Sequence, residues 1–184
     1  MKREGLNTFL SSENIDMHCR YLKQLRLRLS IIRKSYPELL CGDQITNFRR
    51  ITRRIPDGAV TDAKRLIYHI KMHEAYFNSF TTRKEKCQSL KRQFSSEEAL
   101  RYEIYDIIKN EDHGYAFAYI DEKGRIKFSL LKEFPVSETP TPLLAIDLCE
   151  HAYFYDYLFD KDTYYRRAVE SLDLRKIEEA LTSS

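Results

Sequence analysis

The stretch DLCEHAYFYDY, residues 147–157, places an aspartate and a histidine four positions apart, at Asp147 and His151. Glu150 stands beside the histidine, and aromatic residues fill most of the positions that follow. An Asp-x-x-x-His spacing by itself fits two structures: half of a metal site, or an aromatic core segment with charges at its edge. Residues elsewhere in the chain must distinguish these two interpretations.

The composition is that of a globular chain, long enough for one domain or for two small halves that share a core. Of its 184 residues 42% are hydrophobic and 32% are charged, which excludes a disordered protein. No apolar run approaches the roughly 18 residues that a membrane span needs. The N-terminal MKREGLNTFLSSEN lacks the apolar segment of a secretory signal, and the four cysteines show no C-x-x-C spacing. We therefore expect reduced thiols, a cytoplasmic location and no membrane partner.

Positive charge is concentrated in the first part of the chain. The formal net charge is only +3, but residues 1–65 hold 14 Lys/Arg against 7 Asp/Glu. The densest cluster is FRRITRRI, residues 48–55. Such a cluster is most often a solvated helix face; the alternatives are a nucleic-acid contact or a field that attracts a small anion. Because no recognised DNA- or RNA-binding motif accompanies it, we do not expect nucleic acid as a partner.

Two long helices are predicted in the first half. The first begins at Ser11 or Ser12 and ends just before Pro37, which cannot continue it. IPDGAV then interrupts the chain, and we expect Thr61 or Asp62 to cap the second helix. In both helices apolar residues recur every three or four positions, which predicts one buried face that includes a histidine. These faces consist of His18, Leu22, Leu25, Leu29 and Ile32 in the first helix and Leu66, Ile70, His73 and Phe77 in the second.

The second half mixes short strands and helices. Ser95-x-x-Glu98 is a capping box ahead of the helical ALRYEIYDIIKN, and RKEKCQSLKRQF is a short helix candidate. GYAFAYI and RIKFSLL, joined through DEKGR, predict a β-hairpin, and PLLAIDL (142–148) is a third strand candidate. CEHAYFYDYLF and YYRRAVESLDLRKIEEAL are expected to be helical. The predicted fold class is α+β: an antiparallel helical hairpin followed by an α/β domain in which helices wrap a small three-stranded antiparallel sheet.

Three of the five histidines fall on inward faces of three separate elements: His18, His73 and His151. A lone histidine on an apolar face is usually an ordinary core residue. Here, however, Asp147 ends a strand just before the third histidine, and an unpaired buried carboxylate is costly. A cation among the four side chains would account for all of them. Three imidazoles and one carboxylate suit iron, manganese or zinc.

The remaining polar residues near these segments leave alternatives open. His69 and His73 are spaced i, i+4 and could form a two-point metal site by themselves. His113 lies in NEDHGY before a strand, where we expect a turn or surface residue. Glu150 is either a surface carboxylate or an acceptor that orients an imidazole.

These motifs together resemble the iron/manganese superoxide dismutase family. The most specific match is D-x-x-E-H-A-Y at residues 147–153, with TPLLAID before it. LSSENIDMH and IKMHEAYF resemble the family's first-helix and second-helix segments, each of which carries one ligand histidine. HGYAFAYID resembles the strand that follows in the family. The resemblance runs over nearly the whole chain.

The resemblance implies a helical-hairpin domain at residues 1–84 and an α/β domain at residues 85–184, with one mononuclear metal site between them. The implied metal is one iron or manganese ion per subunit, alternately reduced and oxidised as superoxide becomes oxygen and hydrogen peroxide. Family members dimerise, and a glutamate at the position of Glu150 reaches the partner's ligand histidine, so a homodimer is implied. The implied ligands, beside one solvent molecule, are His18, His73, Asp147 and His151.

The chain departs from the family pattern around the site. The family usually carries a histidine four residues, and a tyrosine eight residues, after the first ligand, where this chain has Leu22 and Arg26. The tyrosine that crosses the dimer in the family is replaced by Phe154. The chain contains no tryptophan. The family's site tryptophans are replaced by Phe77, Tyr115, Phe117 and Cys149.

His69 occupies the position at which iron enzymes of the family carry a glutamine that hydrogen-bonds the bound solvent. For this reason we expect iron in preference to manganese; the other interpretation of His69 is that it merely fills space. Arg26 either guides an anion inward or pairs with an acid and closes the approach. On the resemblance we assign catalytic roles to His69, Tyr76, Arg26 and Glu150.

Three functions are then compatible with the sequence. The first is a superoxide dismutase that requires an open metal position. The second is a divergent family member that binds metal, as a metal-binding or regulatory protein, but has lost or changed the activity. The third is a protein- or nucleic-acid-binding module that uses the basic residues 48–55 and a structural metal.

Overall fold

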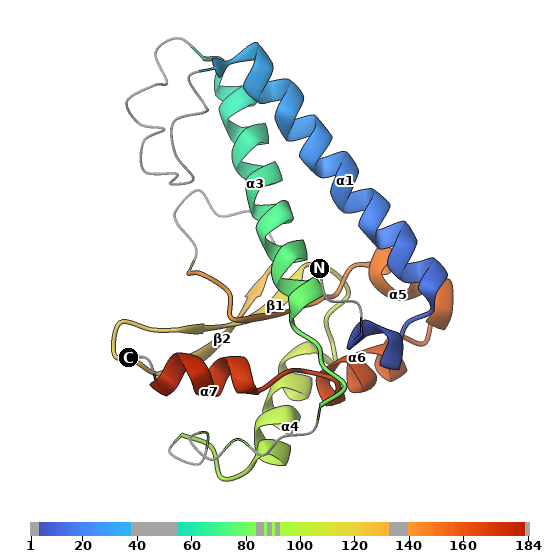
Figure 1. Ribbon diagram of the computed structural model, residues 1–184, viewed down its shortest axis with the longest axis vertical. Helices are drawn as coiled ribbons and strands as arrows, with labels where there is room; N and C mark the ends of the chain where they lie inside the picture. Colours follow the sequence, from blue (N-terminus) through green and yellow to red (C-terminus); the bar gives the residue numbers. More distant parts are fainter. Residues whose placement is uncertain are drawn as a thin grey trace.

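Two long helices stand side by side at one end of the molecule, and a small sheet with shorter helices fills the other (Figure 1). The computed structural model describes residues 4–37, 55–83, 87, 90, 93–132 and 140–182. The long helices are α1 (Ser12–Ser35) and α3 (Asp57–Asn78), and a short 3₁₀ turn, η1 (Leu6–Thr8), precedes them. Residues 48–54 of the basic cluster lie outside the described residues, as does most of the helix candidate at 83–94.

The start of α1 is the one the sequence predicts. Ser11 has extended backbone angles, and its hydroxyl accepts a hydrogen bond from the Asn14 N–H at 3.2 Å. The helix ends at Ser35, two residues before Pro37.

The predicted start of α3 is wrong by several residues. The helix begins directly after Pro56, and Thr61 and Asp62 are exposed residues inside it rather than caps. The proline φ of −56° already suits a helix entry, and Asp57 in the first turn favours the positive end of the helix dipole. Both effects favour a helix start here, although Gly58 follows in the first turn.

Apolar side chains hold α1 and α3 together along the faces that the sequence predicts. Away from the sheet, these helices form their own core cluster, in which each side chain is less than 10% exposed. Nearer the sheet, the same two faces join the main core of the molecule. The separate cluster consists of Leu25, Leu29, Ile55, Val60, Ala63 and Leu66.

The sheet has three antiparallel strands in the order β2-β1-β3: β1 (Tyr115–Ile120), β2 (Ile126–Leu131) and β3 (Leu144–Asp147). In the central strand, Tyr115 pairs with Leu131 on one side and with Asp147 on the other. Gly114 enters this strand with φ of 95°, and a Cβ there would lie 2.4 Å from the Leu131 carbonyl oxygen. A glycine is therefore required where the sheet begins.

Shorter helices complete the domain: α4 (Glu97–Ile108), α5 (Glu150–Tyr157), α6 (Lys161–Glu170) and α7 (Arg175–Thr182). The cap of α4 is Ser96, whose hydroxyl accepts from the Ala99 N–H at 3.0 Å, so the prediction of Ser95 is wrong by one residue. The fold class is the predicted one, α+β with a helix pair followed by a three-stranded antiparallel sheet and helices. Among the described residues, no helix is long and apolar enough to cross a membrane.

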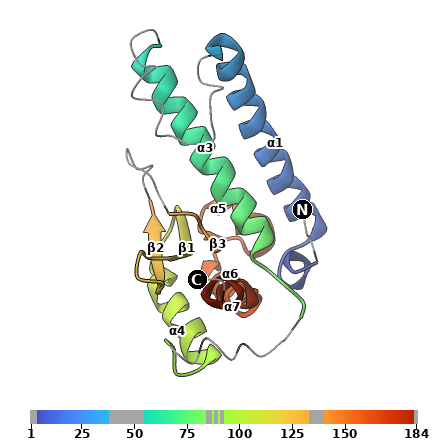
Figure 2. The same ribbon diagram turned by 60° about the vertical axis from the view of Figure 1, so that its left-hand side comes forward.

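The C-terminal end of α3 is tied to the sheet and to the segment before α7 (Figure 2). The buried Ser79 hydroxyl accepts from the Ala145 N–H at 2.7 Å, and the Ser79 carbonyl accepts from the Asp173 N–H at 2.8 Å. Phe80 forms an isolated β-bridge with Leu172. These bonds hold α3 against β3, and so hold His73 near Asp147.

Candidate metal centre

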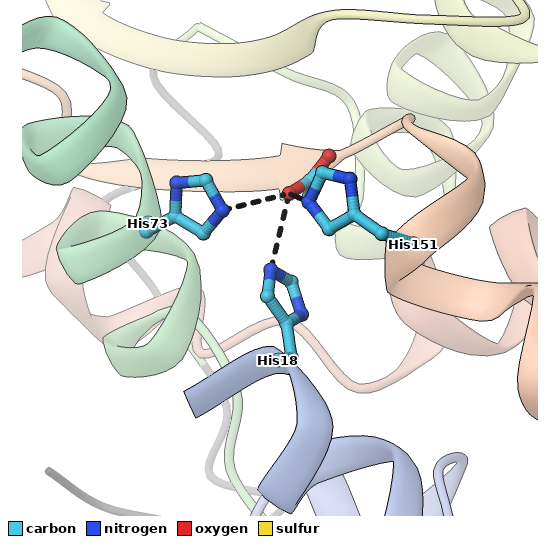
Figure 3. Close-up of side chains that lie close together, drawn as sticks. His18, His73 and His151 are labelled. Atoms are coloured by element: carbon cyan, nitrogen blue, oxygen red, sulfur yellow. Dashed lines mark hydrogen bonds and ion pairs between the residues drawn. The ribbon is translucent and has the colours of Figure 1, made fainter. Parts of the chain in front are cut away.

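Three histidine side chains converge on one oxygen of a buried aspartate (Figure 3). Asp147 Oδ2, at the end of β3, lies 3.3 Å from Nε2 of His18, 3.6 Å from Nε2 of His73 and 3.1 Å from Nε2 of His151. The histidines come from α1, α3 and α5 respectively. One ligand atom from each of the four residues fits within a mutual distance of 4.8 Å. All four residues that the resemblance implied as ligands are thus brought together.

The other polar atoms of Asp147 already have partners. Its second carboxylate oxygen, Oδ1, accepts from the Cys149 N–H at 3.0 Å, and its backbone carbonyl accepts from the Tyr164 hydroxyl at 2.8 Å. The carboxylate is fully buried, as are His18 and His73, whereas the His151 side chain is 34% exposed. Only Oδ2 is left to face the three imidazoles.

The surroundings shift the pKa values of His73 and His151 in opposite directions. Burial lowers the pKa of His73 to about 4, so its ring is neutral at physiological pH. Burial also opposes a charge on His151, but the Asp147 carboxylate outweighs this effect and raises the His151 pKa. Burial alone would raise the pKa of Asp147; the charge and hydrogen bond of His151 outweigh it and hold that pKa well below its usual range. Without a metal, a His151–Asp147 ion pair satisfies the carboxylate.

The donor set fits a metal ion better than it fits an ordinary polar core. Neither ring nitrogen of the buried His18 has a hydrogen-bond partner among the described residues, and its Nε2 faces Asp147 without hydrogen-bond alignment. Unpartnered buried nitrogens are rare in folded proteins. The His73 Nδ1–H donates to the His69 carbonyl at 2.6 Å, which leaves the Nε2 lone pair pointing at the cluster. Three imidazoles and a carboxylate are a ligand set for iron, manganese or zinc.

Tyrosines surround the cluster. Tyr76 is fully buried with its ring centroid 5.0 Å from that of His18, and its hydroxyl lies 3.3 Å from that of Tyr164. Tyr115 places its hydroxyl 2.9 Å from His73 Nδ1. Burial raises the pKa of Tyr76 and Tyr115 far above the ordinary value, so both phenols stay protonated. The sequence-predicted Tyr76 is therefore a neutral group directly behind His18.

A cavity of about 260 Å³ reaches the cluster from outside. His18 and His151 form part of its wall, and Glu150, an exposed residue in the first turn of α5, stands at its edge. The remaining lining is mostly apolar or aromatic: Met17, Tyr21, Phe154 and Tyr155. This cavity gives a small molecule access to the side of the donor set formed by α1 and α5.

Arg26 is not in that cavity. Its Nη2 lies 2.6 Å from Oε1 of Glu74 on α3, and both side chains are about half exposed. Of the two possibilities that the sequence left for Arg26, this structure has the ion pair with an acid. His69, by contrast, lies half-buried next to the cluster, with Nδ1 3.3 Å from the Tyr115 hydroxyl. His113 is exposed, as the sequence predicts.

Two residues of the site, Tyr21 and Tyr164, are not predicted from the sequence. Tyr21 lies over two of the histidines, with ring centroids 4.7 Å from His151 and 5.4 Å from His73. Its position three residues after His18 on the same helix face was the available signal. Tyr164 was read only as part of a helix, and nothing in its local sequence indicates a bond to the Asp147 carbonyl.

Comparison with known protein families matches residues 81–180 to "Iron/manganese superoxide dismutases, C-terminal domain". The matched span is more than half of the 184 residues. It contains Asp147, Glu150 and His151, and the geometry adds His18 and His73 from the two long helices.

Proposed function

Since this chain belongs to the iron/manganese superoxide dismutase family, we propose that it converts superoxide to dioxygen and hydrogen peroxide at one mononuclear metal site. The observation that carries the proposal is the convergence of three imidazoles on one oxygen of a buried carboxylate. The proposed ligands are His18, His73, Asp147 and His151. We further propose that they lie between an N-terminal domain, residues 1–84, and a C-terminal domain, residues 85–184.

A bound iron or manganese ion would supply the chemistry, since it can be reduced by one superoxide and reoxidised by the next. The protein's part is to hold the ligands in the right protonation state and orientation. The Cys149 N–H fixes Asp147, and the His69 carbonyl fixes His73 with Nε2 unprotonated. The cavity beside His18 and His151 would admit superoxide to the side of the ligand set formed by α1 and α5.

We propose iron in preference to manganese, one ion per subunit, with His69 taking the place of the family's solvent-binding glutamine. Its support is position: His69 is one helical turn before His73 and contacts Tyr115 at the edge of the cluster. Burial lowers the pKa of His69 to about 4, so its ring is neutral, as an amide is, and keeps one N–H donor. Catalytic roles for Tyr76 and Glu150 belong to the same proposal.

A homodimer is proposed through the face that carries α5. Glu150 and His151 lie there at the cavity edge, and exposed apolar side chains gather in the same part of the sequence. Phe159 is 90% exposed, and its ring meets that of Phe154 at 5.6 Å. Large exposed apolar groups of this kind are typical of protein interfaces. A cytoplasmic location is proposed because the four cysteines are scattered along the sequence without the spacing of a disulfide framework.

A second candidate function is metal binding without superoxide turnover. The Arg26–Glu74 ion pair favours it, because this pair stands where the family has a neutral tyrosine. The buried Leu22 favours it as well, because it replaces a histidine that could relay protons. In this case the chain would be a metal-binding or regulatory member of the family.

Metal content and turnover, measured together, separate the two candidates. The full chain is purified with its native metal, the metal is identified by elemental analysis, and superoxide turnover is measured for wild type, His73→Ala and the matched control His113→Ala. Turnover in wild type and the control, with none in His73→Ala, supports the dismutase. Metal bound to the wild type, with background turnover in all three proteins, supports the second candidate. Wild type without bound metal would contradict both candidate functions.

A further inference from the structure

A second cavity, of about 490 Å³, lies between the C-terminal half of α1 and Ile70 of α3. This half of α1 extends away from the sheet (Figure 1). The cavity shares no lining residue with the cavity beside the metal centre. Its volume falls in the range of about 300–1,000 Å³ that is typical of small-molecule sites. It is therefore a separate place at which a small molecule can bind.

The charged part of the cavity wall is entirely positive among the described residues. Arg26, Arg33 and Lys34 line the cavity, and no acidic side chain does. α1 carries no Asp or Glu after Asp16, so its second half supplies only cations. The charge of Arg26 is neutralised by Glu74 at 2.6 Å. Arg33 and Lys34 therefore give this cavity a net positive charge.

Arg33 also has a hydrogen-bond donor that is not used. Its Nε is buried and has no hydrogen-bond partner among the described residues. A buried donor of this kind is costly, and it costs more on a charged group. The helix dipole favours cations in the last turn of α1, which accounts for the charges of Arg33 and Lys34 but not for the unpaired Nε. An anion in the cavity would supply the missing acceptor.

The rest of the argument comes from the apolar part of the wall. Leu29 is only 7% exposed, and Ile70 packs against the same core cluster of the helix pair; both line the cavity, as does Pro37. An inorganic anion would pair with the cations but leave this apolar surface in water. A plain hydrocarbon would leave the cations without an acceptor. A molecule with an anionic head and an apolar chain matches both parts of the wall.

We propose that this cavity binds an amphiphilic anion, whose carboxylate or phosphate head is held by Arg33 and Lys34 and whose short apolar chain lies against Leu29 and Ile70. The planar guanidinium of an arginine presents several N–H donors in a geometry that matches the oxygens of either head group. This binding activity goes beyond the proposed function. It does not depend on a metal, because no proposed metal ligand lines the cavity.

Calorimetric titration of the full chain with four probes tests the two parts of the proposal. The probes are octanoate, octyl phosphate, acetate and 1-octanol. Each buried methylene contributes about fourfold in affinity, so at least one of the two octyl anions is expected to bind at least tenfold more tightly than acetate. It is also expected to bind more tightly than 1-octanol, which has the chain but no charge. The tighter of the two octyl anions identifies the preferred head group.

Three results of these titrations would overturn the proposal. Acetate that binds as tightly as the octyl anions would mean that the apolar wall takes no part. Equally tight binding of 1-octanol would mean that the cations take no part. Absence of binding by both octyl anions would remove the site altogether. Superoxide turnover is not measured in any of these titrations, so failure of this site and failure of the proposed dismutase activity are distinguishable.

Two matched variants locate the head group. Arg33→Met removes the donors but keeps an unbranched side chain, and Arg28→Met makes the same change at an exposed arginine of α1 that does not line the cavity. Hydrogen bonds to charged groups are strong enough that Arg33→Met should weaken binding of the octyl anion about 10- to 100-fold. Arg28→Met should bind as wild type does. An equal loss in both variants would indicate general charge attraction and overturn the site.

NMR of the arginine side chains gives a direct readout in the wild-type chain. The Arg33 Nε–H resonance is expected to shift on addition of the octyl anion, whereas the Arg28 Nε–H resonance is expected to stay in place. The backbone ¹H–¹⁵N spectrum of Arg33→Met shows whether this variant is folded. Tight binding without a shift of the Arg33 resonance would place the anion elsewhere and contradict the proposal.

Discussion

Arg26 on α1 and Glu74 on α3 form an ion pair of 2.6 Å at the position where the family pattern has a tyrosine. The side chains are 52% and 48% exposed, so solvent screens the pair and its contribution to stability is small. Its electrostatic effect is local neutralisation, because each charge cancels the attraction or repulsion that the other would exert on an approaching anion.

Removal of Glu74's charge is therefore expected to strengthen anion attraction. In the metal-loaded protein, Glu74→Gln should raise kcat/KM for superoxide about two- to threefold at low ionic strength, and salt should abolish the gain. Pulse radiolysis at several salt concentrations measures this. Glu103→Gln, which removes an exposed charge on α4, is the control for net charge. An unchanged rate in Glu74→Gln would show that the pair lies off the path of the anion.

The sequence predicts the fold well where local and tertiary forces agree. The hydroxyl cap at Ser11 and the stop at Pro37 both act within one helical turn, so α1 is predicted to within a residue or two. At the start of α3 two local signals compete: Asp-Gly suggests a turn, whereas Pro56 followed by an acidic residue favours a helix start. The packing of Val60 and Ala63 against α1 adds a tertiary contribution that decides for the helix and that no local pattern contains.

In the candidate site, too, some features could be predicted from the sequence and others could not. The positions of His18, His73, Asp147 and His151 could be predicted because a spaced motif and two apolar faces marked them. The partners of Arg26 and Tyr115 could not be, because each lies on another element, 48 or 42 residues away in the chain. Such pairs depend on how α1, α3 and β1 pack, and residue types alone do not determine that packing.

Ser79 is expected to be a major point of attachment between the long helices and the sheet. Its buried hydroxyl accepts from the Ala145 N–H at 2.7 Å and donates to the Ala75 carbonyl at 2.6 Å. Ser79→Ala leaves that N–H unsatisfied, which should lower the free energy of unfolding by about 1–3 kcal/mol in denaturant titrations. Ser35→Ala, at the exposed end of α1, is expected to stay within about 0.5 kcal/mol of wild type. Equal stability of both variants would mean that water replaces the Ser79 hydroxyl.

Stability at acid pH is expected to depend on Asp173. Burial would raise the pKa of its carboxyl, but the Arg175 guanidinium at 2.6 Å outweighs burial and holds that pKa below the ordinary 3.8. A lowered pKa in the folded state means that the stabilisation is complete above pH 3.8 and is lost as the pH falls through the folded-state value. Asp173→Asn should therefore melt below wild type at neutral pH, and the two melting curves should approach each other under more acid conditions. A gap between the curves that widens toward acid pH would contradict this sign.

Metal removal is expected to lower the stability of the folded chain, because it leaves the buried His18 side chain without a bonding partner for its nitrogens. Without an ion, the His151–Asp147 pair satisfies the carboxylate, but both nitrogens of His18 stay without hydrogen-bond partners among the described residues. A metal present at about a thousand times its dissociation constant should stabilise the folded state by about 4 kcal/mol. Calorimetry with and without chelator should show a higher melting temperature for metal-loaded wild type and His113→Ala, and no metal-dependent shift for His73→Ala. A shift of equal size in His73→Ala would place the metal elsewhere.

The exposed end of α5 provides a test of the proposed homodimer. Phe159 is 90% exposed and Leu158 57%, and Leu158 also adopts a positive φ of 52° that turns the chain sharply after the helix. A free chain would gain nothing from such exposure, whereas burial of a phenylalanine side chain at an interface contributes about 1.5–3 kcal/mol. In sedimentation velocity, wild type should therefore be a dimer and Phe159→Asp a monomer. Tyr102→Asp, at a 68% exposed aromatic residue of α4, should leave the dimer intact. A monomeric wild type, or a dimer that only Tyr102→Asp disrupts, would assign the interface to another face.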